Sequence, residues 1–337
     1  MNHSNYIALL DPSILNKRRE NSNNLGDLVI YESIKLLLKE LFPQTEIVRI
    51  STHTTFGTFE KNIINQAYLT FVGGSNLLTS NIRHFNRFTP VKKKGFYLFP
   101  GFGNTILIGA GWSEYQKTPD WATKIYYKKI LHKSYYQSVR DSYSATHLSK
   151  TGIKKIINTC CPSTWNLKPE FNNSFQKNLN TVLYTVNGFH NNPEIDHRTI
   201  ELIFKSEQRD IFFFGQTMLD FNYFTNLDIY KKNKHKFKIM NYDYQELIQL
   251  LNTIKLNYIG ARLHGGIRCL QQNNPTLILG LDNRAFEIKK DTMLNVIARE
   301  DINAIQEWIE GKYIPPSLRL PNSNISSWKN QFQSHCN

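Results

Sequence analysis

Cysteine is scarce in this chain of 337 residues, which contains only Cys160, Cys161, Cys269 and Cys336. No two of them have the C-x-x-C spacing of a redox or zinc site. Acidic residues are also few, because 27 Asp and Glu stand against 41 Lys and Arg and leave a net charge of +14. The sequence therefore excludes a disulfide-stapled miniprotein. It predicts a metal-free protein of a reducing compartment with anionic partners.

Long apolar runs are absent too. No stretch approaches the roughly 18 apolar residues of a membrane helix. The apolar run at 7–10 ends at Asp11 without a basic segment before it, so we expect neither a signal peptide nor an anchor. Hydrophobic residues still make up 40% of the chain and aromatic residues 13%, which is enough for a packed core. We expect a globular, cytoplasmic protein of about two domains.

Strand-like apolar runs alternate with helix-length amphipathic segments, which is typical of parallel βαβ units. The predicted strands of a first series are 6–10, 46–50, 67–72, 105–108, 134–139 and 153–158, and those of a second are 181–186, 210–214, 237–240, 257–260 and 276–279. The predicted helices include 25–41, 244–254, 264–272, 302–310 and 326–332, and 167–180 is a candidate linker. We predict an α/β fold with Rossmann-like domains at 1–175 and 176–318 and a helical tail at 319–337. Chemistry is expected in a cleft between the domains, at the carboxyl ends of the strands.

The most informative segment is Tyr-Ile-Gly-Ala-Arg-Leu-His-Gly-Gly-Ile-Arg at 258–268. Arg262 and His264 fall where a strand ends and a helix begins, and free backbone N–H groups at such a place favour an anion. Gly265 permits close backbone approach, and Arg268 shares a helix face with His264. An Arg262 that binds a carboxylate and a buried His264 in the core would also explain the pattern, but we favour a functional site.

Three more segments are candidates. Arg140 follows a strand, although a structural pair with Asp141 at a helix start explains it equally well. Asn24-Leu25-Gly26-Asp27 opens a helix near a possible anion site, although capping alone would explain Asp27. Asp282 and Arg284 follow 276–279, which is taken as the last strand, and here function is slightly favoured.

Several familiar motifs are missing. The sequence has no G-x-x-x-x-G-K-[ST] loop, no G-x-G-x-x-G fingerprint, no D-x-D pair and no G-x-S-x-G elbow. These absences argue against a P-loop nucleotidase, a Rossmann dehydrogenase and an ordinary α/β hydrolase. Phosphate chemistry in this chain is therefore expected to be metal-free and to depend on arginine.

Four segments in this order resemble the polysaccharide pyruvyl transferases: Asn24-Leu25-Gly26-Asp27, Gly73-Gly74, Val139-Arg140-Asp141-x-x-Ser144 and Arg262-Leu263-His264. The resemblance spans roughly 6–287. It departs from the family at Thr159-Cys160-Cys161-Pro162, where many members have Asp-Pro.

The resemblance implies two domains arranged as in GT-B glycosyltransferases, with the acceptor on the N-terminal side and the donor on the C-terminal side. It implies transfer of pyruvate from phosphoenolpyruvate to a sugar as a cyclic ketal, in the synthesis of capsules and exopolysaccharides. We expect phosphoenolpyruvate as the donor substrate, no cofactor and no metal. Matching positions imply catalysis by His264 and Arg262. The substrate-binding residues implied by the resemblance or the segments above are Arg140, Arg268, Gly265, Gly26, Asp27, Gly73, Gly74, Asp282 and Arg284.

The residues suit that chemistry, because Arg binds phosphate and carboxylate in a bidentate manner and His titrates near neutral pH. Two other functions stay open: a GT-B glycosyltransferase that uses a nucleotide sugar, and a non-enzymatic basic module for an anionic glycan or nucleic acid. The scattered basic residues argue against nucleic acid. We expect phosphoenolpyruvate and a sugar acceptor, which could be lipid-linked, as partners, and peripheral contact with the inner face of an anionic membrane.

Overall fold

The computed structural model describes residues 5–15, 22–53, 56–82, 103–206 and 210–333. The chain divides into two compact units. Unit 1 comprises Met1–Ser22, Ile30–Trp165 and Leu320–Asn337, and unit 2 comprises Asn23–Val29 and Asn166–Arg319. Each unit contains its own parallel sheet, so the predicted α/β class is confirmed.

The sheet of unit 1 has the order β2-β1-β3-β4, with all pairs parallel. A second parallel pair, β5-β6, continues from β4 through a bridge between Ala110 and Val139. The strands are β1 (Tyr6–Asp11), β2 (Glu46–Ser51), β3 (Thr70–Gly73), β4 (Thr105–Ile108), β5 (Gln137–Val139) and β6 (Ile156–Asn158). The helices are α1 (Gly26–Leu41), whose first residues belong to unit 2, α2 (Thr58–Gln66), α4 (Trp121–Ile130), α5 (Ser142–Ser149) and α13 (Asn322–Asn330), with a 3-10 turn at Pro162–Thr164.

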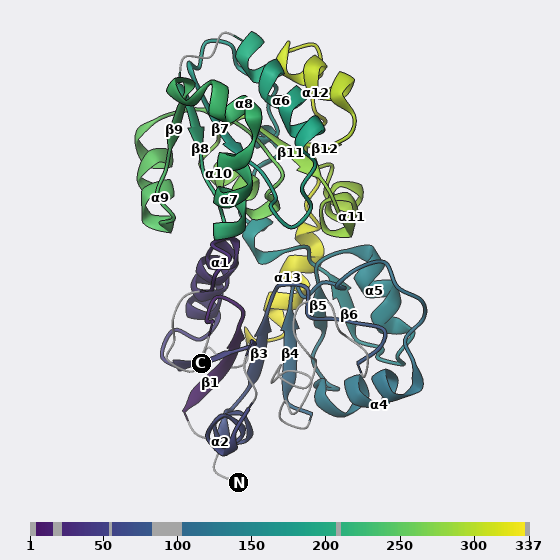
Figure 1. Cartoon of the computed structure of the whole chain (residues 1–337). Coiled ribbons are helices and arrows are strands. Elements are labelled where there is room, and N and C mark those ends of the chain that lie inside the picture. Colours follow the sequence, from purple (N-terminus) through teal and green to yellow (C-terminus); the bar gives the residue numbers. More distant parts are fainter. Residues whose placement is uncertain (1–4, 16–21, 54–55, 83–102, 207–209, 334–337) are drawn as a thin grey trace. The chain divides into compact units, whose positions relative to one another are not determined.

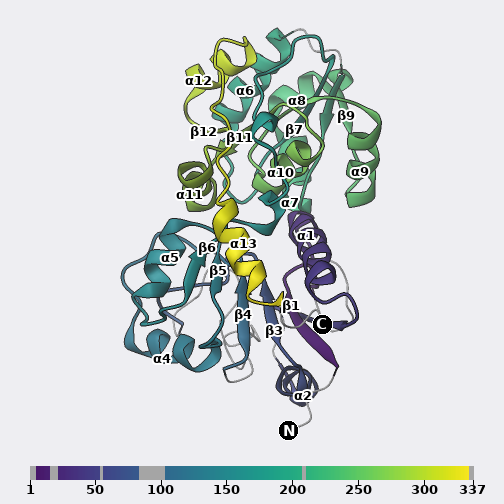
Figure 2. The same cartoon turned by 180° about the vertical axis from the view of Figure 1, so that it is seen from behind.

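The C-terminal helix α13 packs on unit 1 although it is distant in sequence. Trp328 and Phe332 are fully buried and contact Phe71 of β3 edge to face. The indole Nε1 of Trp328 donates a hydrogen bond to the carbonyl of Tyr136 at 2.9 Å. Figures 1 and 2 show this yellow helix alongside the strands of unit 1.

The sheet of unit 2 has the order β12-β11-β10-β7-β8-β9, and every pair is parallel. Its strands are β7 (Thr181–Thr185), β8 (Asp210–Phe213), β9 (Phe237–Ile239), β10 (Asn257–Gly260), β11 (Thr276–Gly280) and β12 (Val296–Ala298). Its helices are α6 (Pro193–Lys205), α7 (Met218–Asn226), α8 (Asp228–Lys232), α9 (Tyr244–Thr253), α10 (Leu263–Gln271), α11 (Asn283–Thr292) and α12 (Ile302–Ile309), with 3-10 turns at Pro169–Phe171 and Lys234–Lys236.

Numbered from β7, the strand order of unit 2 is that of a Rossmann sheet, 3-2-1-4-5-6. The connections change direction between β7 and β10, so the loops that follow these two strands lead away from each other. Such a switch point leaves a crevice at the carboxyl edge of the sheet, where ligands of this fold class bind.

Most predicted strands lie within one or two residues of the observed ones. The predicted strands 134–139 and 153–158 are too long, because only Gln137–Val139 and Ile156–Asn158 pair. The predicted strand 67–72 begins too early, since Ala67 is the C-cap of α2. The interpretation of 276–279 as the last strand is wrong, because β12 pairs with β11 beyond it.

The predicted site glycines Gly73 and Gly74 lie at the end of β3, at the switch point of unit 1 between β1 and β3. A Cβ on Gly73 would lie 2.9 Å from Cδ1 of Ile34. A Cβ on Gly74, whose φ is +57°, would lie 2.6 Å from Cγ2 of Ile30. Both glycines therefore let the end of β3 approach α1 closely.

Candidate active site

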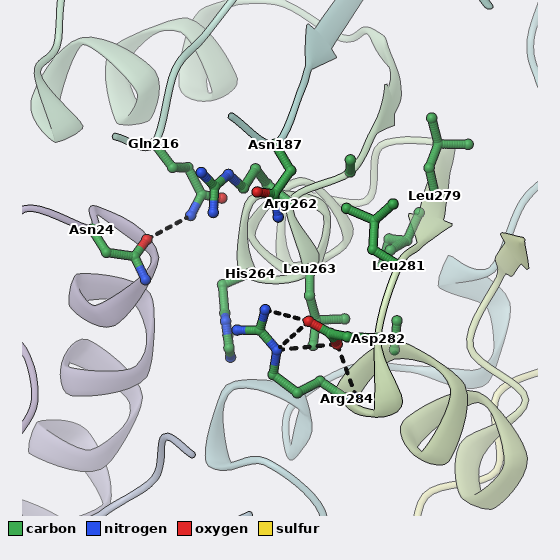
Figure 3. Close-up of a pocket in the computed structure, with 13 residues that line it drawn as sticks. Asn24, Asn187, Gln216, Arg262, Leu263, His264, Leu279, Leu281, Asp282 and Arg284 are labelled. Atoms are coloured by element: carbon green, nitrogen blue, oxygen red, sulfur yellow. Dashed lines mark hydrogen bonds and ion pairs between the residues drawn. The ribbon is translucent and has the colours of Figure 1, made fainter. Parts of the chain in front are cut away.

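A pocket in unit 2 lies at the carboxyl edge of the sheet, at its switch point (Figure 3). Polar side chains come from the loops after four strands: Asn187 after β7, Gln216 after β8, Arg262 after β10, and Asp282 and Arg284 after β11. His264 of α10 and Asn24 complete the polar lining. The cavity volume is about 30 Å³, which is enough for a few water molecules.

Arg262 is the N-cap of α10 and is buried to more than nine-tenths. Its Nε donates to Oδ2 of Asp220 at 2.9 Å, and its Nη2 bonds Oδ1 of the same carboxylate and Oγ1 of Thr217. Nε also lies 3.2 Å from the carbonyl of Val186, at the end of β7. Arg262 therefore joins the two strands that flank the switch point.

Local geometry explains why the chain turns into α10 at this point. Gly260 is required there, because a Cβ would lie 2.0 Å from Oγ1 of Thr185. The carbonyl of Arg262 accepts hydrogen bonds from Oη of Tyr258 at 2.8 Å and from the backbone N–H of Gly266 at 3.0 Å. Complete burial raises the pKa of Tyr258 far above its ordinary value, so this hydroxyl stays a donor.

His264 lies in the first turn of α10 and is 9% exposed. In this first turn, the backbone N–H groups have no acceptor within the helix. The imidazole of His264 therefore lies at a helix N-terminus, where an anionic ligand is favoured.

Arg284 and Asp282 form a second ion pair in the pocket, at the start of α11. Nη2 of Arg284 lies 2.5 Å from Oδ2 of Asp282, and the side chains are 29% and 25% exposed. Burial alone would lower the pKa of Arg284, but the charge and hydrogen bonds of Asp282 and the charge of Asp27 outweigh it, so the pKa is raised. Arg284 is thus a permanent cation at the pocket, and its pairing is less buried than that of Arg262.

The other sequence-predicted residues of unit 2 are Gly265, Gly26, Asp27 and Arg268, and none of these described residues belongs to the pocket lining, although the first three neighbour residues that do. Gly265 and Gly26 are both beside the amide of Gln216, and Asp27 accepts a hydrogen bond from Nδ2 of Asn24 at 3.4 Å. Nη1 of Arg268 donates to Oε1 of Gln271 at 2.9 Å, and Arg268 lies outside the pocket lining formed by the described residues.

Arg140 belongs to unit 1, where it is 2% exposed. Its Nε lies 3.0 Å from Oδ2 of Asp141, and its other nitrogens contact Asn76 and the carbonyl of Trp112. The guanidinium packs on Gly111, at which a Cβ would lie 2.1 Å from Cζ of Arg140. The Arg–Asp pair at a helix start, left open by the sequence, is the arrangement present.

Sequence reasoning missed Asn187, Gln216 and Asp220. The available signal was their position, since Asn187 and Gln216 come two or three residues after the buried strands β7 and β8. Asp220 has no comparable signal, because it lies within α7 and its partner Arg262 is 42 residues away. Among the described residues, no group of three or more His, Cys, Asp or Glu side chains could hold a metal ion.

The profile of the polysaccharide pyruvyl transferase family matches residues 24–283, which is most of the chain. The chain belongs to the polysaccharide pyruvyl transferase family. It is therefore a member of a transferase family, and the recognition of that family from its motifs is confirmed.

Solved structures share the fold of this pyruvyl transferase family member. A UDP-GlcNAc 2-epimerase from Methanocaldococcus jannaschii, in complex with UDP-GlcNAc and UDP, has a TM-score of 0.53 at 15% identity and covers 98% of this chain and 99% of its own. The S. aureus MnaA–UDP structure has a TM-score of 0.50 at 8% identity, with 98% and 96% covered. These likenesses support the Rossmann-like, GT-B-like architecture. No curated protein sequence matches the chain.

Proposed function

We propose that this protein transfers pyruvate from phosphoenolpyruvate to a sugar of a surface polysaccharide or its precursor, and that the product is a cyclic ketal. The observation that carries the proposal is the convergence of His264, Arg262 and Arg284 at the switch-point pocket of a chain that belongs to this family. Phosphoenolpyruvate presents a phosphate and a carboxylate on a short frame, and guanidinium groups bind both.

The proposed reaction forms two C–O bonds and releases phosphate. The oxygen of one acceptor hydroxyl bonds to C2 of phosphoenolpyruvate while C3 gains a proton and becomes a methyl group. The bond between C2 and the phosphate oxygen then breaks, and the second hydroxyl oxygen bonds to C2. Of the two hydroxyl protons, one is balanced by the proton gained at C3 and the other leaves on phosphate.

The surroundings of each residue suggest its role in this reaction. His264 supplies the proton to C3, because an imidazole exchanges protons near neutral pH. Arg284 binds an anionic group of the donor by exchanging its partner Asp282, which is 25% exposed, for it. Arg262 keeps its buried partner Asp220, holds the start of α10 beside the donor and contributes positive charge.

The test is phosphate release from phosphoenolpyruvate in the presence of sugar acceptors. We expect His264→Ala to lower kcat on the order of 10² or more, because the proton transfer loses its donor, while phosphoenolpyruvate still raises the Tm of the variant. The matched control is His197→Ala, which removes a half-exposed histidine of α6 paired with Glu201. Full activity of His264→Ala would contradict the assignment.

The same assay distinguishes phosphoenolpyruvate from a nucleotide sugar as the donor. Both structural neighbours named above are UDP complexes, so a UDP-sugar is the relevant competitor. Turnover of a UDP-sugar without turnover of phosphoenolpyruvate would move the function to a nucleotide-sugar glycosyltransferase.

We also propose that the enzyme works in the cytoplasm at the inner face of an anionic membrane, where lipid-linked sugars are assembled. Support comes from the net charge of +14 and from one face of α4 in unit 1. On that face Trp121 and Ile125 are 66% and 46% exposed, and Lys124, Lys128 and Lys129 lie within the next turns. Among the described residues, no helix has the length and apolar character needed to cross a bilayer.

A further inference from the structure

Gln216 is a polar side chain of the pocket that the chemistry above leaves without a role. It follows β8, it is 4% exposed, and its backbone carbonyl accepts a hydrogen bond from the N–H of Leu25 at 3.0 Å. Its amide lies between two glycines. A Cβ on Gly26 would be 2.4 Å from Nε2, and a Cβ on Gly265 would be 2.7 Å from Oε1. These two glycines therefore leave space for the Gln216 amide.

The orientation of this amide is fixed by its neighbours. The backbone N–H of Gly26 donates to Oδ1 of Asn24 at 3.2 Å, and Nδ2 of Asn24 faces the carboxylate of Asp27. Asn24 must therefore present its oxygen to Gln216, and the atom of Gln216 that lies 3.3 Å from it must be the donor Nε2. Figure 3 shows this bond between the two amides, with the oxygen of Gln216 on the other side of its amide carbon.

The oxygen Oε1 of Gln216 is buried and has no hydrogen-bond partner among the described residues. An amide oxygen only accepts hydrogen bonds, and a buried acceptor without a donor is unfavourable. At neutral pH the carboxylate of phosphoenolpyruvate is ionised and its phosphate is largely dianionic, so both groups mainly accept hydrogen bonds. The natural partner in a pocket that otherwise presents Arg262, Arg284 and His264 to anions is an O–H group of a neutral substrate.

We propose that Gln216 is a specificity-determining residue that accepts a hydrogen bond from a hydroxyl group of the acceptor sugar. This inference rests on the proposed function. The bond directs the proton of that hydroxyl toward Oε1 and leaves an oxygen lone pair available for bonding to C2. Gln216 orients the hydroxyl and takes no proton itself, because an amide is not a base at neutral pH.

The test compares the wild-type enzyme with Gln216→Met, which keeps the side-chain length and removes the acceptor. The matched control is Gln249→Met at an exposed position of α9. The probes are methyl α-D-mannopyranoside, methyl β-D-galactopyranoside and methyl β-D-glucopyranoside. We expect Gln216→Met to raise the KM for each sugar that is turned over by about ten-fold, while its affinity for phosphoenolpyruvate alone stays within two-fold.

A second variant, Gly265→Ala, should give the same increase in KM, because its Cβ displaces Oε1 without changing Gln216. If the wild type turns over none of the sugars, their binding in the presence of phosphoenolpyruvate is compared by saturation-transfer NMR. Equal KM or equal binding in wild type and Gln216→Met overturns the inference while the proposed function stands. A ten-fold loss of phosphoenolpyruvate affinity also overturns it, because Gln216 would then belong to the donor. A wild type that does not bind phosphoenolpyruvate removes the proposed function itself.

Discussion

Asp220 is fully buried and yet accepts four hydrogen bonds. Two come from the guanidinium of Arg262 and two from the backbone N–H groups of Gly188 and Thr217. Gly188 follows β7, Thr217 caps α7, and Arg262 caps α10. One carboxylate therefore holds together three segments at the carboxyl edge of the unit 2 sheet.

We expect Asp220→Ala to lower the free energy of unfolding by about 3–5 kcal/mol, because it leaves the Arg262 charge buried without its partner. Chemical denaturation measures this loss. The comparison variant is Asp210→Ala, whose pair with Lys238 is 39% and 57% exposed and should contribute less than about 1 kcal/mol. Equal effects of the two variants would contradict the role given to Asp220.

The sequence located Arg262, His264, Asp282 and Arg284 because each follows a recognisable strand, and the ends of parallel strands share an edge. The sequence could not say how they pair. Whether Arg262 binds a ligand or Asp220 depends on α7, a helix whose aromatic and polar residues gave no clear period. The roles of these residues in catalysis stay predictions.

At the scale of elements, Gly74 follows β3 and packs closely against α1 in unit 1. Its φ is +57°, and a Cβ would lie 2.6 Å from Cγ2 of Ile30. A side chain in this left-handed conformation costs roughly 1–2 kcal/mol even where space is available. The glycine pair that resembles a family motif thus has a structural reason to be glycine.

We expect Gly74→Ala to reduce the free energy of unfolding by at least about 1–2 kcal/mol, since the strained backbone and the Ile30 clash add up. Urea denaturation gives the size of the effect. Gly311→Ala is a suitable control, because its φ is +73° but nothing lies within 4 Å of the added Cβ. If Gly74→Ala lowered the free energy of unfolding less than Gly311→Ala does, the contact with Ile30 would not contribute to the effect. Weaker phosphoenolpyruvate binding by folded Gly74→Ala would support the predicted substrate contact instead.

Element boundaries show where sequence periodicity is informative. The strands β4 and β10 were predicted to the residue, because each is a buried apolar run that glycine or a polar residue ends. The strand β12 was missed, since Val296–Ala298 is too short for a period and only its pairing with β11 defines it. Helix α13 was placed four residues late at its start, because Pro321 rather than a polar cap precedes it.

At the scale of the whole molecule, the net charge of +14 favours binding to anionic surfaces, but it does not specify which part of the protein binds them. The face of α4 is the candidate, because Trp121 and Ile125 are exposed one helical turn apart among lysines. Each lysine near an anionic leaflet contributes about 1 kcal/mol. The variant Lys124→Glu, Lys128→Glu, Lys129→Glu reverses three of these charges. We therefore expect it to bind anionic vesicles about a hundred-fold more weakly, or weaker still.

The measurement is sedimentation with phosphatidylglycerol vesicles, and phosphatidylcholine vesicles show how much binding depends on lipid charge. A variant with the same change in net charge but elsewhere, in unit 2, carries Lys231→Glu, Lys232→Glu and Lys234→Glu. All three of these lysines are exposed. If both triple variants lose binding equally, net charge alone explains it and the α4 face has no special part. If only the α4 variant loses binding, the α4 face is the membrane-binding surface. If Trp121→Ala also weakens the vesicle binding that remains at high salt, the apolar residues of that face insert into the lipid surface, because salt screens only the charges.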